Sequence, residues 1–448
     1  MAEKLTAALS TPRPAWQTKF HDTVRSLKHR NFQLFFSGQI ISLVGTWMDT
    51  VAEGWLVYRL TGSSLLLGTV TFAGQLPVLL ISPFAGLVAD RLNRRKIVIA
   101  TQIASMIIAG FLAGLTLAKR ITVDEVIVLA ALMGIVNAFD IPARQSFLVE
   151  MVGREDLMNA IALNSSMFNA ARIIGPSIAG ILVASVGEGW CFFANSVSYI
   201  AVIAGLLLMK VPVRPREEVL VSPFEHIAEG FRFVRRAGPI RALLLLVGLV
   251  SLVAMPYAVL MPVFAAKVLH GNARTLGILM ASAGLGALAG ALVLASRRGV
   301  KGLSRMVSVA CAAFGLALIL FSLSHWWILS ALLLVPVGFS VMTQMGSTNT
   351  LIQSMVPDRL RGRTMAVYSM MFLGMAPFGA LLSGWSADLL GAPRTLEIGG
   401  LIAILGALVF ARQLPKIRAE ARELLAAANV EAAQASEMAE ELAARVIP

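Results

Sequence analysis

Residues 306–357 read MVSVACAAFGLALILFSLSHWWILSALLLVPVGFSVMTQMGSTNTLIQSMVP and contain no Lys, Arg, Asp or Glu. Because about 20 apolar residues are enough for one helix to cross a bilayer, this stretch is long enough for two membrane spans. His325 marks the expected turn between them. Further charge-free runs cover residues 60–89, 97–118 and 242–266. The repetition of such runs predicts a helical protein that crosses a membrane many times.

The composition excludes an ordinary soluble enzyme. Of the 448 residues, 57% are hydrophobic and 14% are charged, whereas soluble domains carry roughly 25% charged residues. Cys191 and Cys311 lie singly inside apolar runs, and the five histidines lie outside the runs or at their edges. No nucleophile–base pair or metal-ligand spacing is visible in the spans. We therefore predict no enzyme activity, no metal and no cofactor.

The charge pattern predicts twelve spans and therefore an all-α membrane protein. The expected spans are 33–58, 64–88, 97–118, 124–144, 158–186, 189–209, 240–265, 275–296, 304–324, 326–348, 364–388 and 393–412. The segments on the side of the N-terminus hold 31 Lys and Arg residues and those on the other side hold 6. Since cytoplasmic loops collect basic residues, both termini are expected in the cytoplasm of a multi-pass inner (plasma) membrane protein. The partner of the spans is the lipid bilayer. The excess of basic residues in the cytoplasmic segments explains the net charge of +13, so no nucleic-acid partner is predicted.

The two halves of the chain repeat each other. A shift of 204 residues places Gly134 on Gly338, Gly175 on Gly379 and Gly180 on Gly384. Parallel repeats of this kind occur in transporters, whose substrate site lies between the halves near the midplane of the membrane. The expected organisation is a cytoplasmic segment 1–32, a six-helix bundle 33–210, a cytoplasmic linker 211–239, a second bundle 240–412 and a cytoplasmic tail 413–448.

Three charged residues lie at membrane depth, where each is costly and calls for an explanation. Asp49 and Glu53 share one face of the first span, and Arg172 lies near the middle of the fifth. In the first interpretation the carboxyls face a water-filled cavity and carry a proton or hold a cationic group. In the second, Asp49 and Arg172 form an ion pair that locks the two helices together.

Neutral polar residues also lie within the spans. Gln75, Asn137, Tyr257 and Tyr368 are candidates for the cavity wall, and hydrogen bonding between helices is the alternative explanation for them.

Residues 86–96 read GLVADRLNRRK and follow the second span directly. Gly86 permits close helix contact, Asp90 can accept hydrogen bonds from the start of another helix, and Arg91, Arg94 and Arg95 can anchor the loop. This pattern resembles the signature of the loop between the second and third helices in the major facilitator superfamily. The resemblance implies a cytoplasmic gate in which Asp90 meets the start of the eleventh helix near Arg363, joined by Arg91, Asp140 and Arg144.

Residues 171–180 read ARIIGPSIAG in the fifth span. Gly175 and Pro176 give a kink, and Gly180 extends a face of small side chains that can pack closely. The segment is similar to the motif that marks the antiporters of the superfamily, which implies a role in sealing the interface between the halves. A generic kinked helix is the alternative.

Four further segments, at residues 55–63, 83–86, 140–145 and 356–363, make the chain similar to the drug/proton antiporter branch that contains macrolide efflux pumps and enterobactin (siderophore) exporters. The resemblance implies a functional monomer that exports a small amphipathic molecule, drug-like or siderophore-like, in exchange for protons by alternating access. A flippase for lysophospholipids or other lipids, and a metabolite uptake transporter, are the alternatives with the same fold.

Overall fold

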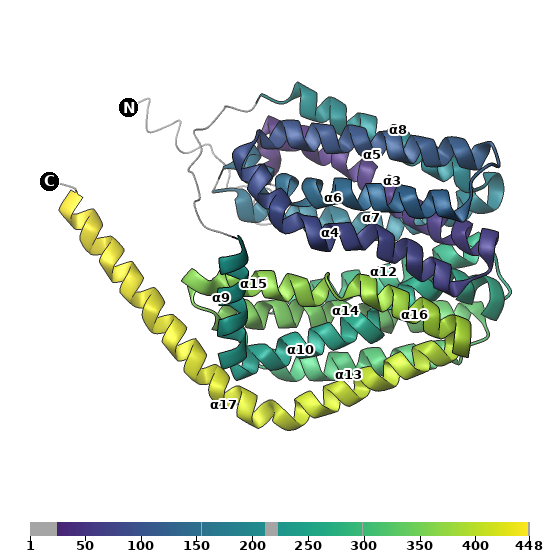
Figure 1. Ribbon diagram of the computed structural model, residues 1–448. Helices are drawn as coiled ribbons and strands as arrows, with labels where there is room; N and C mark the ends of the chain where they lie inside the picture. The colour runs from purple at the N-terminus through teal and green to yellow at the C-terminus, as the bar shows by residue number, and fades with distance from the viewer. Residues whose placement is uncertain (1–24, 154, 211–222, 298, 447–448) are drawn as a thin grey trace, which may run out of the picture.

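The structure is a computed structural model that describes residues 25–153, 155–210, 223–297 and 299–446. The side chains of Leu87, Asp90, residues 223–227, Asp358 and residues 421–446 lie outside this description. Figure 1 shows two bundles of roughly parallel helices, one stacked on the other. Strands are absent from the described residues, so the expected all-α fold is confirmed.

The first bundle begins with a short 3-10 helix and contains six long helices. These are η1 (Arg25–Lys28), α3 (Arg30–Thr61), α4 (Ser64–Arg91), α5 (Arg94–Leu117), α6 (Val123–Val152), α7 (Leu157–Val186) and α8 (Glu188–Leu208). Within it, α3 packs against α7 and α8, while α4 packs against α6 and α5 packs against α6 and α8.

The second bundle follows a helix that lies across its end, α9 (Pro223–Arg236), which packs against α15 and α10. Its elements are α10 (Gly238–Val253), η2 (Met255–Leu260), α11 (Met261–Val263), η3 (Phe264–Val268), α12 (Ala273–Ala295), α13 (Leu303–Ser322), α14 (Trp327–Met355), α15 (Asp358–Phe372), α16 (Ala376–Leu390) and α17 (Ala392–Val446). The last of these continues without a break beyond the expected end of the twelfth span and projects away from the bundle (Figure 1).

Polar caps and glycines fix the turns between the helices. Gly62 takes a positive φ of 64° and ends α3, and the side chain of Ser63 accepts a hydrogen bond from the backbone of Leu66 at the start of α4. Thr122 and Glu125 form a reciprocal capping box at the start of α6. These caps supply partners for backbone groups that a helix end leaves unpaired, and they hold the loops short.

Eleven helical segments in the described part of the chain are long and apolar enough to cross a membrane. The long helix α3, which matches the first expected span, is not among them. Its buried face carries Gln39, and Asp49 and Glu53 lie in its second half. These polar residues lower the mean hydropathy of α3. The helix tolerates them because it packs against α7 and α8 inside the first bundle and does not face lipid on all sides.

The helix boundaries repeat with the shift found in the sequence. Moved by 204 residues, α4 falls on α12, α6 on α14 and α8 on the first part of α17. In the same way α7 falls on the pair α15 and α16, and α3 falls on the series that begins with α10. The two bundles are therefore built on one plan, and the two largest contacts between them, α7 with α12 and α4 with α16, are related by the repeat.

The second bundle departs from that plan at two breaks. Where α3 and α7 are continuous, the series from α10 to η3 is interrupted after Val253, and α15 ends three residues before α16 begins. Pro256 and Pro262 lie in the first break and Pro377 lies at the start of α16. Proline lacks a backbone N–H and disfavours a continuous helix, and it lies at both interruptions, although other helices of the chain, such as α4, continue through internal prolines.

The segment of residues 25–29, which contains η1, is attached to the start of α7. The carboxylate of Asp156, whose side chain is 2% exposed, accepts contacts from Arg25 Nε at 2.5 Å, Lys28 Nζ at 2.7 Å and His29 Nε2 at 2.7 Å. Hydrogen bonds from Lys28, and then from His29, hold the pKa of this carboxyl well below its usual range, against the opposite effect of burial. The charged form of Asp156 is therefore the one that fastens the segment to the bundle.

We predict that Asp156→Asn frees this segment and lowers the thermal unfolding midpoint, and that trypsin then cleaves after Arg25 or Lys28 several-fold faster. Because the native pKa lies below the unfolded value near 3.9, the stabilisation is complete above about pH 5 and is lost as the pH falls through the native pKa. Asp124→Asn, which removes an exposed carboxylate, is the control. Equal cleavage of wild type and Asp156→Asn at pH 7 would contradict the prediction.

Candidate functional site

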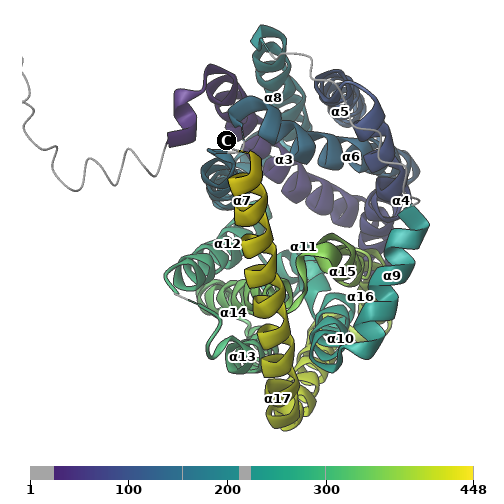
Figure 2. The same cartoon turned by 90° about the vertical axis from the view of Figure 1, so that its left-hand side faces the viewer.

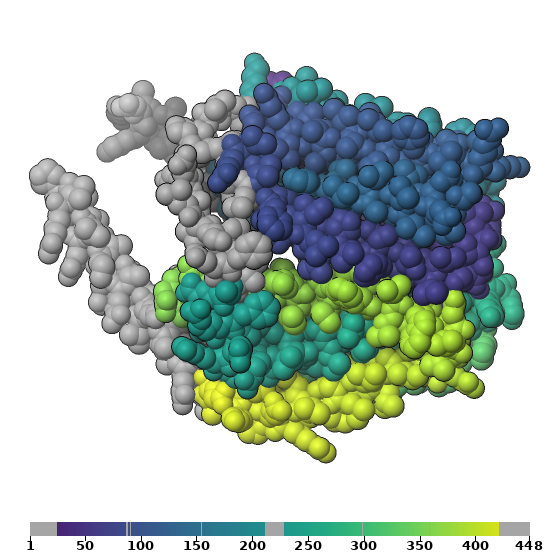
Figure 3. All heavy atoms as spheres, viewed as in Figure 1, coloured from purple at the N-terminus to yellow at the C-terminus, as the bar shows by residue number. Residues whose placement is uncertain are grey.

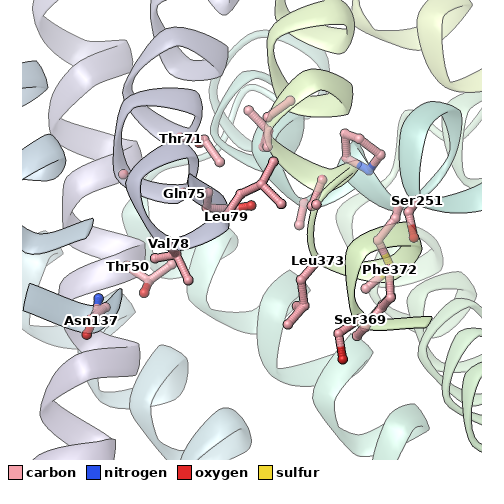
Figure 4. A pocket seen from close by; sticks show the side chains of 18 of the residues that line it. Thr50, Thr71, Gln75, Val78, Leu79, Asn137, Ser251, Ser369, Phe372 and Leu373 are labelled. Atoms are coloured by element: carbon pink, nitrogen blue, oxygen red, sulfur yellow. The ribbon is translucent and has the colours of Figure 1, made fainter. Parts of the chain in front are cut away.

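A cavity of about 1090 Å³ lies between the two bundles. The first bundle lines it with residues of α3, α4, α6 and α7, and the second with residues of α10, η2, α11, α12, α15 and α16. Figure 4 shows Gln75 and Asn137 on one wall and Ser251, Ser369 and Leu373 on the other. The wall is mainly apolar with a few polar groups, as is usual for sites that bind small molecules.

The cavity is closed at one end of the molecule. We call the end of the molecule from which the last part of α17 projects the terminal face, and the end where α16 is followed by α17 the opposite face (Figure 1). At the opposite face Asp388 accepts hydrogen bonds from Ser63 Oγ at 2.8 Å and from the backbone N–H of Ser64 at 2.7 Å. Deeper along the same pair of helices, the rings of Phe72 and Phe378 meet edge to face at 5.8 Å. These contacts join α4 to α16.

A second closure joins α7 to α12 through glycine. A Cβ placed on Gly277 would lie 2.5 Å from the carbonyl oxygen of Pro176, and one on Gly180 would lie 3.1 Å from the carbonyl oxygen of Ala273. In the repeat-related contact, a Cβ on Gly384 would lie 2.5 Å from the carbonyl oxygen of Ser64. Backbone therefore touches backbone at both closures. The space between bundles ends there.

Toward the terminal face the bundles part. Gly86, near the terminal end of α4, lines the cavity, and no described atom lies within 4 Å of a Cβ placed on it. The same is true of a Cβ placed on Gly362 in α15. Figure 2, which looks from the terminal face, shows α3, α4 and α6 on one side and α11, α12 and α15 on the other. In the space-filling view the seam between the two halves runs along the molecule (Figure 3). As far as the described residues are concerned, the cavity is open toward the terminal face and closed at the opposite face.

Four of the seven residues predicted for the cavity line it, namely Gln75, Asn137, Arg172 and Tyr257. The hydroxyl of Tyr368 instead donates to the carbonyl oxygen of Met345 at 3.4 Å. The aromatic Trp47 and Phe168 also line the cavity and were not singled out from the sequence. Their only sequence signal is spacing, since each lies within one helical turn of a residue that faces the cavity.

Asp49 and Glu53 are not among the residues that line the cavity. Asp49 faces α8, next to Asn195. The Oδ1 atom of Asp49 and the Nδ2 atom of Asn195 are buried without a hydrogen-bond partner. Arg172 makes no ion pair with Asp49 in the described part of the chain; its guanidinium lies 5.7 Å from the ring centre of Trp47. The structure therefore separates the two carboxyls from the arginine.

The arginines of the 86–96 motif bind within the first bundle. Arg94 pairs with Glu150 of α6 at 3.0 Å, and Arg95 donates to the carbonyl oxygens of Leu206 at 2.8 Å and Leu207 at 2.9 Å. A cation at the last carbonyls of α8 is favourable, because these groups have no partner inside the helix. Arg91 is exposed at the end of α4, and the side chain of Asp90 lies outside the described residues.

The other residues expected at the gate also have partners inside their own half. Asp140 is buried, accepts hydrogen bonds from Thr101 at 2.8 Å and Gln102 at 3.0 Å of α5, and pairs with Arg144 at 3.1 Å. Arg363 pairs with Glu229 of α9. With the terminal face open, these groups hold helices together inside each bundle.

The motif at 171–180 brings α7 against two helices. A Cβ on Gly175 would lie 2.4 Å from the Cβ of Trp47, so this glycine permits close contact with α3. The next residue, Pro176, and Gly180 further along the helix meet α12 as described above. The same ten residues therefore place Arg172 beside Trp47 and form half of the closure at the opposite face.

A membrane protein of two repeat-related bundles around a cavity that opens to one side is a transporter. The family model described as "Transmembrane secretion effector" matches residues 22–445, and the chain belongs to this family of the major facilitator superfamily. It is therefore a multi-pass membrane transporter and not an enzyme, as the sequence predicted.

The chain is similar to known transporters over nearly the whole length of those proteins. The chain is 28% identical to the staphyloferrin A transporter of Staphylococcus aureus (84% of this chain, 94% of that one) and 29% identical to the multidrug efflux pump Tap of Mycolicibacterium fortuitum (84% and 93%). It is 27% identical to the enterobactin exporter EntS of Salmonella typhi (87% and 95%).

Solved structures share the fold. The nucleoside transporter NupG superposes with a TM-score of 0.66 at 13% identity over 86% of this chain and 98% of that one. A bacterial homolog of the human lysosomal transporter Spinster, inward-facing and occupied, gives 0.68 at 14% identity over 86% and 97%.

We predict that Gly277→Leu opens the closure at the opposite face. Its side chain would collide with the backbone of Pro176 and Gly180, and such overpacking costs about 1–3 kcal/mol, which shifts a two-state balance by roughly 5-fold to 150-fold. A reporter cysteine at Thr71, in the cavity wall, should then react with an impermeant maleimide added at the opposite face. The native Cys191 and Cys311 are buried.

The control for this experiment is Gly114→Leu, because a Cβ at Gly114 meets no described atom within 4 Å. It should leave the labelling pattern of the wild type, which reacts from the terminal face. Labelling of the Gly277→Leu protein from the terminal face alone would show that this glycine contact does not close the cavity.

Proposed function

We propose that the chain is a secondary active transporter that exports a small amphipathic molecule, drug-like or siderophore-like, in exchange for protons. The observation that carries the proposal is the cavity, closed at one face by two repeat-related contacts and open at the other. A rocking motion of the bundles that separates those contacts would expose the same cavity to the opposite face. The relatives named as exporters and efflux pumps support the direction of transport.

The open terminal face is proposed to be cytoplasmic. Counted from the sequence, the segments expected on the side of the N-terminus hold 31 Lys and Arg residues and those on the other side hold 6, which favours a cytoplasmic position in an inner (plasma) membrane. The substrate would then enter from the cytoplasm. The cavity is lined by residues of one chain, which supports a functional monomer.

Asp49 and Glu53 are proposed as the proton carriers. They lie one helical turn apart on α3, and the buried Oδ1 of Asp49 has no hydrogen-bond partner among the described residues. A buried carboxylate without a cation is costly, and binding a proton removes its charge. Because α3 packs on α7, a change in the charge of Asp49 can alter how α7 rests against α12. Proton uptake would thereby favour one state of the cavity.

The membrane potential makes this coupling useful. A proton that enters down 100 mV contributes roughly 2.3 kcal/mol. That free energy supports an outward gradient of the exported molecule of almost two decades.

We predict that Asp49→Asn abolishes proton-driven transport and leaves the protein folded. The test uses proteoliposomes with an internal pH indicator and two amphipathic dyes, fluorescein and rhodamine 123. Wild type should move protons when a transported dye is added, and the variant should do so at least about tenfold more slowly, because a uniformly neutral residue 49 cannot bind and release a proton. Dye exchange without a pH gradient should persist.

Asp124→Asn serves again as the control, since it removes a carboxylate at the exposed start of α6. A variant with Asn at position 49 that retains the full pH response would remove Asp49 from the coupling mechanism. Glu53→Gln, measured in the same assay, shows whether Asp49 carries the proton alone or shares it with Glu53.

A further inference from the structure

Arg172 is the one ionised side chain among the described residues that line the cavity. The rest of the wall is apolar or carries neutral hydroxyl and amide groups. An arginine keeps its positive charge at any physiological pH. The cavity therefore presents a fixed cation in a wall that otherwise offers no charge to a ligand.

Aromatic residues hold this cation in place. The guanidinium of Arg172 lies over the ring of Trp47 with its central carbon 5.7 Å from the ring centre, and Phe168 meets the same ring edge to face at 5.6 Å. Tyr257, from the second bundle, also lines the cavity, and its hydroxyl lies close enough to Arg172 for a side-chain hydrogen bond. Stacking of this kind orients a guanidinium and leaves its N–H groups available at the edge.

The protein itself supplies no counter-charge. In the described part of the chain, none of the ion pairs with N···O distances within 4 Å includes Arg172. Asp49 and Glu53 lie outside the cavity wall, and Asp49 faces α8. Arg172 is half-buried, and a cation at membrane depth with only neutral neighbours is stabilised when an anion pairs with it.

The repeat shows that this charge is not needed for packing. The position that corresponds to Arg172 in the second bundle is Ala376, which also lines the cavity. The adjoining glycines Gly175 and Gly379 both make close contacts with the neighbouring helix. One half of the molecule therefore builds the same interface with a methyl group where the other half has a guanidinium.

We propose that the cavity selects amphipathic anions, with a carboxylate or phosphate of the ligand bound by the guanidinium of Arg172 and its apolar part packed on the aromatic wall. The proposal deepens the proposed function, on which it rests, by naming the class of transported molecule. Guanidinium and carboxylate or phosphate form paired, charge-assisted hydrogen bonds, which are stronger than neutral ones. Such an anion can belong to a soluble molecule or to the head group of a single-chain lipid.

The test is equilibrium binding to the purified full-length protein in nanodiscs of neutral lipid, without a proton gradient. Fluorescein and rhodamine 123 share one ring system and carry opposite charges at pH 7.5. Lysophosphatidylglycerol and lysophosphatidylcholine, as competitors, give the same comparison for a lipid head group. Wild type should bind fluorescein more tightly than rhodamine 123.

Two substitutions of Arg172 separate charge from shape. Arg172→Gln should weaken binding of the anionic probe that wild type prefers by at least about tenfold, because a charged hydrogen bond contributes about 1.5–3 kcal/mol. Arg172→Lys, which keeps the charge and loses the paired geometry, should show a smaller loss and serves if the Gln variant does not fold. Arg120→Gln, at an exposed turn, makes the same change in net charge and should bind as wild type does.

The outcomes separate the ligand class from the transport mechanism. Selective loss of fluorescein binding supports a soluble anion, and selective loss of competition by lysophosphatidylglycerol supports a lipid head group. Equal losses for both dyes, tighter binding of rhodamine 123 by wild type, or no binding of either anionic probe would overturn the proposal. The binding experiment uses no proton gradient, so its result does not depend on whether Asp49 couples transport to protons. Equally, a failure to find anion selectivity would leave the result of the Asp49 experiment unchanged.

Discussion

The two bundles meet where backbone can touch backbone, and the rest of the architecture depends on that contact. Gly180 lets α7 reach α12, and its repeat counterpart Gly384 lets α16 reach α4. In a bilayer, helices gain little from burying apolar surface against each other, so close packing at small residues is what holds them together. Two such contacts at one face, with none at Gly86 or Gly362, produce a cavity that is closed on one side.

Polar groups inside the molecule divide into those that have partners and those that do not. Asp140 receives two hydrogen bonds and an ion pair, and Arg95 holds the last carbonyls of α8. Among the described residues, the Oδ1 atom of Asp49 is buried without a hydrogen-bond partner, and Arg172 forms no ion pair although it lines the cavity. Ionisable groups at membrane depth are costly unless they are neutralised or paired, so we propose a proton as the partner of Asp49 and an anionic ligand as the partner of Arg172.

Much of the fold could be predicted because lipid imposes one rule on every span. Charge-free runs give the helices, and the shift of 204 residues gives the two bundles and the glycines that join them. Gln75 and Asn137 were predicted to line the cavity and do so, since polar groups on inner helices have few other places to go. The breaks after Val253 and Phe372 were not predicted, because a proline can kink a helix or end it. The sequence also could not show that Asp49 faces α8. Helical periodicity places Asp49 and Glu53 on one face of α3, but it does not show which helix packs against that face.

The central claim is that the bundles rock so that the glycine contacts separate as the terminal face closes, and pairs of spin labels test it most directly. One pair joins Met158 of α7 to Gln353 of α14 near the terminal face, and the other joins Val186 to Leu389 at the opposite face; all four side chains are exposed. Between pH 5 and pH 8, the distance distributions should change in opposite directions, one pair closing as the other opens. Distances that stay fixed, or that lengthen together, would contradict the account.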